Sequence, residues 1–324
     1  MIKNVDSIDA VVLAGEREGS IPVMGKNKAL LDFRGRPLID CVVESLDKAE
    51  RVKTITVVGP PPSLEDALSK IKTEKTVKLV EQGSNVFENI WRGSMSTFPD
   101  GNPDSTWDDM ADSPHKEKFV LALTCDVPML HPVEVNRFVE TMPADRADFI
   151  FGVSTEEILK PYEPTDTEPG ITFLKAVLKE KIIRHSNVIC LRPLRLGHVM
   201  EKYIPMAYGL RYQRHYRNII KGLFKVLRHA LDPGSLSLFL LVQSASWCHN
   251  HGHYGMRDVI RRPVTLEWAE RQASEAIGTR FAIHETAGPG PTLDVDDEES
   301  YRTFLTMIDK WREIQAEQLR PFLP

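Results

Sequence analysis

Two hydrophobic periodicities alternate through the first half of this 324-residue chain, and that alternation constrains the fold more than any other feature. Short apolar runs, rich in Val, Ile, Leu or Thr, lie at residues 10–13, 54–58, 77–80 and 119–124. Polar or turn residues bound each run, which is typical of strands buried on both faces of a parallel sheet. Amphipathic stretches separate the runs, at residues 38–48, 64–72, 86–96 and 132–141. The pattern predicts an α/β fold whose mostly parallel sheet carries helices on both faces.

The second half changes character. Residues 148–153 predict a fifth strand, after a loop at residues 99–115 that is dense in Asp, Pro, Gly and Ser. From residue 191 helical spacing dominates, until a strand-like stretch at 280–284 and a last helix at 298–317. We interpret residues 191–279 as an α-helical insertion into a core formed by residues 1–190 and 280–324.

Composition excludes several classes of protein. The net charge of −5 argues against a nucleic-acid partner, so any basic surface must be local. The longest uncharged apolar run, residues 236–242, is far shorter than the roughly 20 residues that cross a bilayer. The N-terminus has no apolar stretch of signal-peptide length, and the four cysteines lie far apart without a CxxC pair. These features predict a soluble, cytoplasmic protein.

The loop after the first apolar run is long and rich in small residues. It begins Leu13-Ala14-Gly15-Glu16-Arg17 and ends near Lys28. In open α/β sheets ligands bind beyond the carboxyl ends of the strands. Small residues let backbone N–H groups approach phosphate, and a lysine can neutralise developing charge. The loop matches neither GxxxxGK[ST] nor GxGxxG, which argues against a P-loop or a dinucleotide-binding motif; a flexible loop with surface lysines is the alternative.

A carboxylate follows the fourth apolar run. Residues 119–124 deliver Cys125-Asp126-Val127-Pro128 at the carboxyl end of a predicted strand. A hard divalent cation held against phosphates would sit beside such a side chain. Asp126 is therefore a candidate magnesium ligand, and its alternative role is that of a turn or helix-capping residue.

These segments together resemble the sugar-phosphate and molybdenum-cofactor nucleotidyltransferase superfamily, the MobA-like NTP transferases. The resemblance is carried by the Asp-x-Pro at Asp126 and by the segments Leu13-Ala14-Gly15, Lys28-Ala29-Leu30-Leu31 and Gly35-Arg36-Pro37-Leu38. It implies a glycosyltransferase-A-like (Rossmann-like) sheet, a triphosphate contact for Lys28 and Mg²⁺ on Asp126. The match is incomplete at Glu16, where the family has a second glycine, and at Arg17, whose offset differs.

The resemblance also implies a second magnesium ligand near the C-terminus. The segment Leu293-Asp294-Val295-Asp296 is similar to the family's closing acidic motif. Asp294 and Asp296 would share one side of an extended segment, so both are candidates. The alternative is that the acidic residues begin the last helix, where carboxylates suit the helix dipole.

Two further segments carry expectations from the family. Gly83-Ser84-Asn85 and Asn89 stand where the family reads the nucleobase, although Ser84 or Asn85 also suits a helix N-cap. Arg184 and Asn187 stand where related sequences face the acceptor, or they shape a turn.

Two features of the insertion remain open. Cys248, His249, His251 and His253 are dense in metal-binding side chains, but ligands this close in sequence rarely enclose one ion, which disfavours zinc. Residues 211–229 read as a basic amphipathic helix, with no acidic residue. Such a helix packs on its own domain, or makes peripheral contact with an anionic membrane.

The sequence therefore predicts a magnesium-dependent nucleotidyltransferase. It would transfer a nucleoside monophosphate from a nucleoside triphosphate to a phosphorylated small-molecule or lipid acceptor and release pyrophosphate. The alternatives are a molybdenum-cofactor guanylyl- or cytidylyltransferase and a catalytically inactive nucleotide-binding regulatory protein, the latter suggested by Glu16.

Overall fold

The computed structural model describes residues 5–16, 22–196 and 233–323. Arg17 and the predicted basic helix at residues 211–229 lie outside the described residues. In the described part, the strands are β1 (Ile8–Leu13), β2 (Val52–Gly59), β3 (Val77–Glu81), β4 (Val120–Thr124), β5 (Phe149–Thr155), β6 (Ala176–Val177), β7 (Ile182–Leu191) and β8 (Phe281–Glu285). They form one sheet in the order β3-β2-β1-β4-β7-β5-β8, with β6 paired to β7.

The sheet is mostly parallel. β7 runs antiparallel to its neighbours β4, β5 and β6, and the remaining pairs are parallel. The carboxyl ends of β1 to β5 and of β8 therefore meet at one edge, together with the start of β7. The predicted α/β class is confirmed.

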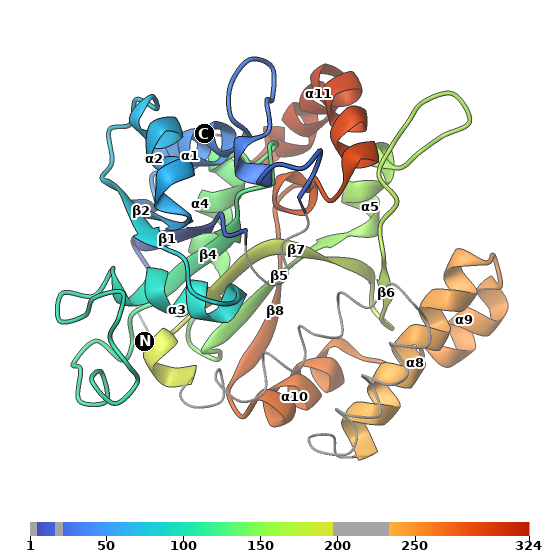
Figure 1. Cartoon of the computed structure of the whole chain (residues 1–324). Helices are drawn as coiled ribbons and strands as arrows, with labels where there is room; N and C mark the ends of the chain where they lie inside the picture. Colours follow the sequence, from blue (N-terminus) through green and yellow to red (C-terminus); the bar gives the residue numbers. More distant parts are fainter. Residues whose placement is uncertain (1–4, 17–21, 197–232, 324) are drawn as a thin grey trace.

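Helices cover both faces. The described α-helices are α1 (Leu38–Lys48), α2 (Pro61–Ser69), α3 (Val86–Met95), α4 (Pro132–Thr141), α5 (Glu156–Leu159), α8 (Pro233–Asn250), α9 (Tyr254–Ile260), α10 (Leu266–Ile277) and α11 (Glu298–Leu319). Alternation along β1 separates two cores, because successive side chains of a strand point to opposite faces. Ala10 and Val12 pack with α1, α2 and α4, whereas Val11 packs with α3 (Figure 1).

The helices α8, α9 and α10 occupy the described part of the predicted insertion. Leu238, Leu241 and Val242 of α8 pack with Val153 of β5 and Ile183 of β7. The apolar run at residues 236–242 thus lies inside an 18-residue helix. Figure 1 shows α8 and α9 side by side next to β6, at one end of the molecule. None of the described helices is both long and apolar enough to cross a membrane.

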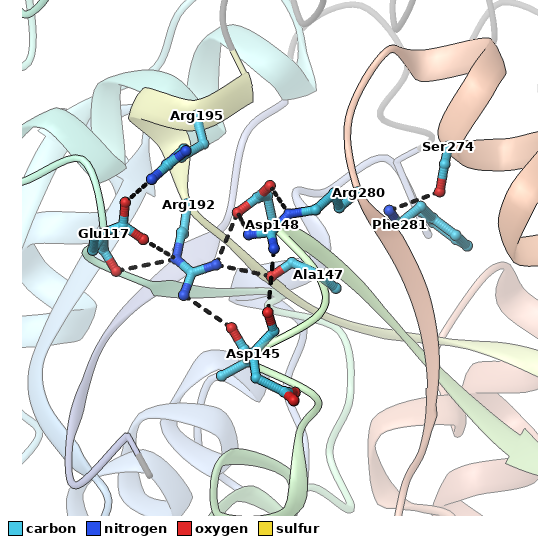
Figure 2. Close-up of polar contacts among 10 residues, drawn as sticks. Glu117, Asp145, Ala147, Asp148, Arg192, Arg195, Ser274, Arg280 and Phe281 are labelled. Carbon is cyan, nitrogen blue, oxygen red and sulfur yellow. Dashed lines mark hydrogen bonds and ion pairs between the residues drawn. The ribbon is translucent and has the colours of Figure 1, made fainter. Parts of the chain in front are cut away.

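A buried ionic network ties strands together at the edge opposite the carboxyl ends. Asp148, just before β5, accepts hydrogen bonds at 2.8 Å from Arg192 Nη1 and from Arg280 Nε. Arg192 also donates to the carbonyl oxygens of Ala144 and Ala147 and lies over the ring of Phe119. Figure 2 shows the Asp148 carboxylate between the two guanidinium groups. The network joins the starts of β5 and β8 to the end of β7.

Candidate active site

The long loop after β1 folds back onto the strand through Asn27. Its side-chain amide donates to the carbonyl oxygen of Ala14 at 3.0 Å. Its Oδ1 accepts from the backbone N–H of Ala29 at 3.0 Å, which caps the short 3₁₀ helix Lys28–Leu30. The loop is therefore anchored at both ends, and Lys28 is placed at the carboxyl edge of the sheet.

Lys28 faces three carboxyl groups there. Its Nζ lies 2.9 Å from Asp126 Oδ2 and 3.5 Å from Asp296 Oδ1. Asp294 is buried beside them, whereas the side chain of Asp296 is about half exposed. The N–H of Val295, between the two aspartates, donates to the carbonyl oxygen of Asp126 at 2.9 Å. The structure thus brings together the lysine and all three aspartates that the sequence singled out.

The electrostatics of this cluster follow from burial and from the close opposite charges. Burial opposes the charge on Lys28, but attraction to Asp126 and Asp296 outweighs it and raises the pKa of the ammonium. Burial also disfavours charge on Asp126, yet Lys28 holds the pKa of this carboxyl below its usual value. For Asp294, burial and the neighbouring Asp296 and Asp126 raise the pKa to about 7. One ammonium thus faces more negative charge than it can neutralise.

A divalent cation would relieve this imbalance. Asp126 Oδ1 is buried and has no hydrogen-bond partner among the described residues. In the part of the chain that the structure describes, no group of three His, Cys, Asp or Glu side chains is arranged around one ion position. Mg²⁺ usually takes only one or two carboxylates and completes its shell with water and substrate phosphates. Asp126 together with Asp294 or Asp296 would supply such a pair of carboxylate ligands.

A cavity of about 510 Å³ opens beside the loop, and its lining residues include Glu16, Gly25, Asn27, Pro60 and Gln82. The backbone N–H of Glu16 donates to Gln82 Oε1 at 2.8 Å, which joins the end of β1 to the end of β3. Gln82 and Asn27 were not predicted. The signal for Gln82 was its position directly after a predicted strand, at the edge where ligands bind.

Gly15 leaves no room for a side chain. A Cβ there would lie 2.7 Å from Asn89 Nδ2 and 3.0 Å from Gln82 Oε1. Asn89 is itself buried, and its Oδ1 accepts from the N–H of Gly83 at 2.7 Å. The structure therefore places Asn89 beneath the loop. A backbone hydrogen bond also joins the end of β1 to the segment after β4. The carbonyl oxygen of Leu13 accepts from the N–H of Cys125, which precedes Asp126.

Ser84 and Asn85 are engaged at the start of α3. Asn85 is the N-cap and accepts from the backbone N–H groups of Phe87 and Glu88. Ser84 bonds to the Glu88 carboxylate through both its N–H and its hydroxyl. Of the two roles considered for these residues, capping is the one for which the structure supplies contacts.

Comparison with known proteins decides the family. The model of the MobA-like NTP transferase domain matches residues 10–178, more than half of the chain. The protein belongs to this family. The family is one of nucleotidyltransferases.

The relatives of this MobA-like protein are distant. It is 28% identical over 71 residues to a 2-C-methyl-D-erythritol 4-phosphate cytidylyltransferase of Trichodesmium erythraeum (strain IMS101), a match that covers 21% of the chain and 31% of that relative. A hypothetical transferase structure from Thermus thermophilus shares 20% identity at a TM-score of 0.58, covering 91% of this chain and 99% of that one. A CMP:2-keto-3-deoxy-manno-octonic acid synthetase solved with CTP shares 15% identity at a TM-score of 0.45, covering 94% and 100%. The likeness to the Thermus structure supports the fold.

The candidate acceptor residues of this MobA-like protein lie within a strand. Of the two roles considered for Arg184 and Asn187, shaping a turn is wrong, because both belong to the antiparallel strand β7. Val188 pairs with Leu123 of β4, so Asn187 lies next to the β4 end that carries Asp126. Arg184 is near enough to Asp294 to lower the pKa of that carboxyl. Both residues therefore lie in the part of β7 that pairs with the carboxyl ends of β4 and β5.

The Cys/His cluster does not converge on one point. Cys248 is buried, and His249 Nε2 lies 3.0 Å from Glu156 Oε1. His251 stacks on the ring of Trp247, and His253 lies against the same ring. His249 thus ties α8 to the end of β5, whereas His251 and His253 pack on the ring of Trp247, which stays about half exposed.

Proposed function

We propose that this protein transfers a nucleoside monophosphate from a nucleoside triphosphate to a phosphorylated acceptor and releases pyrophosphate. The observation that carries the proposal is the Lys28–Asp126 pair at 2.9 Å, with Asp294 and Asp296 beside it and the small-residue loop alongside. A structural ion pair needs one carboxylate, whereas this cluster gathers three around one ammonium. Such an excess suits a site that holds a cation against phosphate.

The residues would act by positioning and electrostatics. The acceptor phosphate oxygen attacks the α-phosphorus, a new P–O bond forms, and the bond to the β-phosphate oxygen breaks. Lys28 would stabilise the developing negative charge, and the loop at Gly15 would present a backbone N–H to a phosphate oxygen, because the N–H of Ala14 already donates to the carbonyl oxygen of Val58. Asp126 with Asp294 or Asp296 would hold Mg²⁺, which when bound would supply positive charge to the phosphate oxygens.

The base and the acceptor belong to the same proposal. CTP is the first nucleotide to try, because the curated relative is a cytidylyltransferase. The acceptor would be a phosphorylated small molecule or lipid, approached from the side of Arg184 and Asn187. Peripheral membrane contact through residues 211–229 stays a prediction.

One observation favours a second function. Glu16 lies in the cavity lining at a position where the family has glycine, and a carboxylate there repels phosphate. A nucleotide-binding regulatory protein without turnover is therefore the alternative. A molybdenum-cofactor guanylyl- or cytidylyltransferase is the other, and it differs only in acceptor and base.

The test is pyrophosphate release with Mg²⁺ and each of CTP, GTP, UTP and ATP, against pooled sugar, polyol, lipid and pterin phosphates. Removing one preorganised charge costs a factor of about 10²–10³ in rate, so Asp126→Ala and Lys28→Ala should each lose at least that much. Lys70→Ala is the matched control, since Lys70 is the C-cap residue that follows α2 and its side chain is 68% exposed. Tight nucleotide binding with no release from any pool would favour the regulatory reading.

A further inference from the structure

The outward side of α8 and α9 gathers large apolar side chains. Among the described residues, ten large hydrophobic side chains are exposed, and five of them fall between residues 240 and 259. They are Leu240, Trp247, Tyr254, Met256 and Val259, each between 50% and 59% exposed. Concentration of half the set in so short a stretch marks an interaction surface, because single exposed apolar residues are ordinarily scattered.

The apolar side of α8 is also free of charge. Leu240, Gln243, Ser244 and Trp247 are exposed and recur at spacings of three, four and seven, which puts them on one face of the helix. None of them is ionisable. The exposed face of α8 is therefore uncharged, with Leu240 and Trp247 as its apolar residues, and the neighbouring helix α9 adds the exposed Met256 and Val259.

The rim of this surface is basic in a protein that is acidic overall. Residues 233–263 contain three arginines and one aspartate, whereas the whole chain carries a net charge of −5. The aspartate, Asp258, is paired with Arg257 at 2.8 Å and with Arg261 at 3.1 Å. Arg262 is exposed, as are His251 and His253. The carboxylate of Asp258 is about half exposed, but it is paired with two arginines, and residues 233–263 keep an excess of arginine over aspartate that favours an anionic partner.

The opposite side of the helix pair is fixed to the core. His249 Nδ1 lies 3.2 Å from Arg257 Nη1. Because a guanidinium only donates, this nitrogen must accept, so the Nε2–H donates to Glu156 Oε1 at 3.0 Å. Glu156 follows β5 directly at the carboxyl edge of the sheet. The exposed surface is thus held rigidly, on the same edge as the candidate active site.

We propose that this surface, formed by Leu240, Trp247, Tyr254, Met256, Val259 and Arg262, docks the protein on an anionic lipid bilayer. Trp and Tyr favour the membrane–water interface, and a basic rim adds attraction to anionic headgroups. A second copy of the chain fits less well, because a two-fold contact would set the arginine-rich rims against each other. The surface is distinct from residues 211–229, and docking does not depend on the proposed transfer reaction.

Co-sedimentation of the full chain with vesicles tests the apolar part. The chain should sediment with phosphatidylcholine–phosphatidylglycerol vesicles and much less with phosphatidylcholine alone. The double substitution Met256→Gln/Val259→Gln should lower the partition coefficient at least about tenfold, because it removes two exposed apolar side chains that would be buried in the bilayer. Leu305→Gln/Leu323→Gln is the matched control, with side chains 40% and 51% exposed elsewhere, and it should bind like the wild type.

The charge and the site of contact are tested separately. Arg262→Glu should weaken binding roughly tenfold at low salt, whereas Arg320→Glu, on an exposed arginine of the C-terminal turn, should not. With brominated acyl chains in the vesicles, tryptophan fluorescence should be quenched in the wild type. Trp247→Phe should keep binding within about twofold and lose most of that quenching.

Several results would overturn the proposal. These are absence of sedimentation with anionic vesicles, equal binding by the Met256/Val259 variant, and unchanged quenching in Trp247→Phe. A concentration-dependent dimer that the Met256/Val259 variant dissociates, without vesicle binding, would assign the surface to a second copy. Each variant should have the circular dichroism spectrum of the wild type, which excludes misfolding as the cause of a loss of binding.

Discussion

Asp294 combines full burial with two like-charged neighbours, and this combination has a measurable consequence for stability. Its pKa of about 7 lies well above the value of about 3.9 expected in the unfolded chain. Between these values the folded protein holds a proton that the unfolded chain has lost, so the free energy of unfolding falls as the pH rises. At pH 8 the group is charged in both states and its burial destabilises the fold in full.

We therefore expect Asp294→Asn to stabilise the protein while it damages the site. In urea titrations with a chelator present, the variant should gain about 1–3 kcal/mol in the free energy of unfolding at pH 8. The gain should vanish at about pH 3, well below the unfolded pKa, where the carboxyl is protonated in both states of the wild type. Added Mg²⁺ should then stabilise the wild type more than the variant.

Asp309→Asn serves as the comparison for this charge effect, because Asp309 is an exposed residue of α11 that pairs with Arg34. It should change the free energy of unfolding by less than about 0.5 kcal/mol at either pH. A loss of stability in Asp294→Asn at pH 8 would contradict the explanation, since it would mean that the charged form is favoured.

At the scale of elements, the sequence predicted those strands whose neighbours bury both faces. β1 and β4 lie in the centre of the sheet and are buried on both faces, so nearly every residue is apolar. Each strand therefore stands out in the sequence as an apolar run. β7 alternates buried and half-buried positions and carries Arg184, His185 and Asn187, so it read as a polar segment. Its antiparallel pairing with β4 and β5 depends on residues far away in the chain, which local periodicity does not encode.

The site was predictable to the extent that topology decides it. Parallel strands bring their carboxyl ends to one edge, and that rule placed Asp126 near the loop that carries Lys28. The supporting contacts were not predictable, because they join residues distant in sequence through side-chain geometry. Gln82 accepts from the N–H of Glu16 across 66 positions, and although its place after a strand marks the edge of the sheet, no local pattern indicates this contact.

Glu134 of α4 is the contact that holds the acidic segment in place. Its Oε1 accepts from the N–H of Gly290, four residues before Asp294, at 2.8 Å. Its Oε2 accepts from the N–H of His131 and from Gln315 Nε2 of α11. Burial raises the pKa of Glu134 to about 8, and these donors work against that shift. The carboxylate thereby connects α4, the turn at Gly290 and α11.

We expect Glu134→Gln to weaken this connection. Above about pH 8, where Glu134 is ionised, the new amide group would turn a donor toward the donors on His131 and Gln315, at a cost of about 1–3 kcal/mol in the free energy of unfolding. Hydrogen exchange of the Gly290 amide should also become faster. Glu140→Gln on the same helix is the control, because its carboxylate is 39% exposed, and its effect should stay below about 1 kcal/mol. Unchanged exchange at Gly290 would show that Glu134 does not restrain the turn.

At the scale of the whole molecule, polar networks stand at the two opposite edges of the sheet. The carboxyl edge holds a cluster with excess negative charge, which favours a ligand over stability. The other edge holds Asp148 between Arg192 and Arg280, where positive and negative charges are matched (Figure 2). The second network closes the sheet where β5, β7 and β8 begin or end, so it supports the site without touching it.

Asp148→Asn should accordingly lower stability without changing the chemistry. The side chains of Asp148 and Arg192 are 7% and 6% exposed, and loss of the carboxylate leaves a buried guanidinium without its counter-charge. Removing one partner of such a pair costs about 3–5 kcal/mol. Arg280→Ala should cost less, about 0–1 kcal/mol, because Arg280 is half exposed and Arg192 remains. Turnover per folded molecule should be unchanged in both variants.

The pH dependence of the stability lost in Asp148→Asn shows whether the charge of the carboxylate causes that loss. Burial disfavours charge on Asp148, but the hydrogen bonds and attraction from Arg280 and Arg192 prevail and hold its pKa below the usual value. A carboxyl with a lowered pKa stabilises the fold above its unfolded pKa of about 3.9, and this stabilisation disappears as the pH falls through the folded value. The difference in free energy of unfolding between wild type and Asp148→Asn should therefore be largest at pH 6 to 8, on the order of 3 kcal/mol, and shrink below about pH 4. A difference that stays constant down to acid pH would mean that Asp148 acts through packing and neutral hydrogen bonds, since the arginines keep their charge throughout.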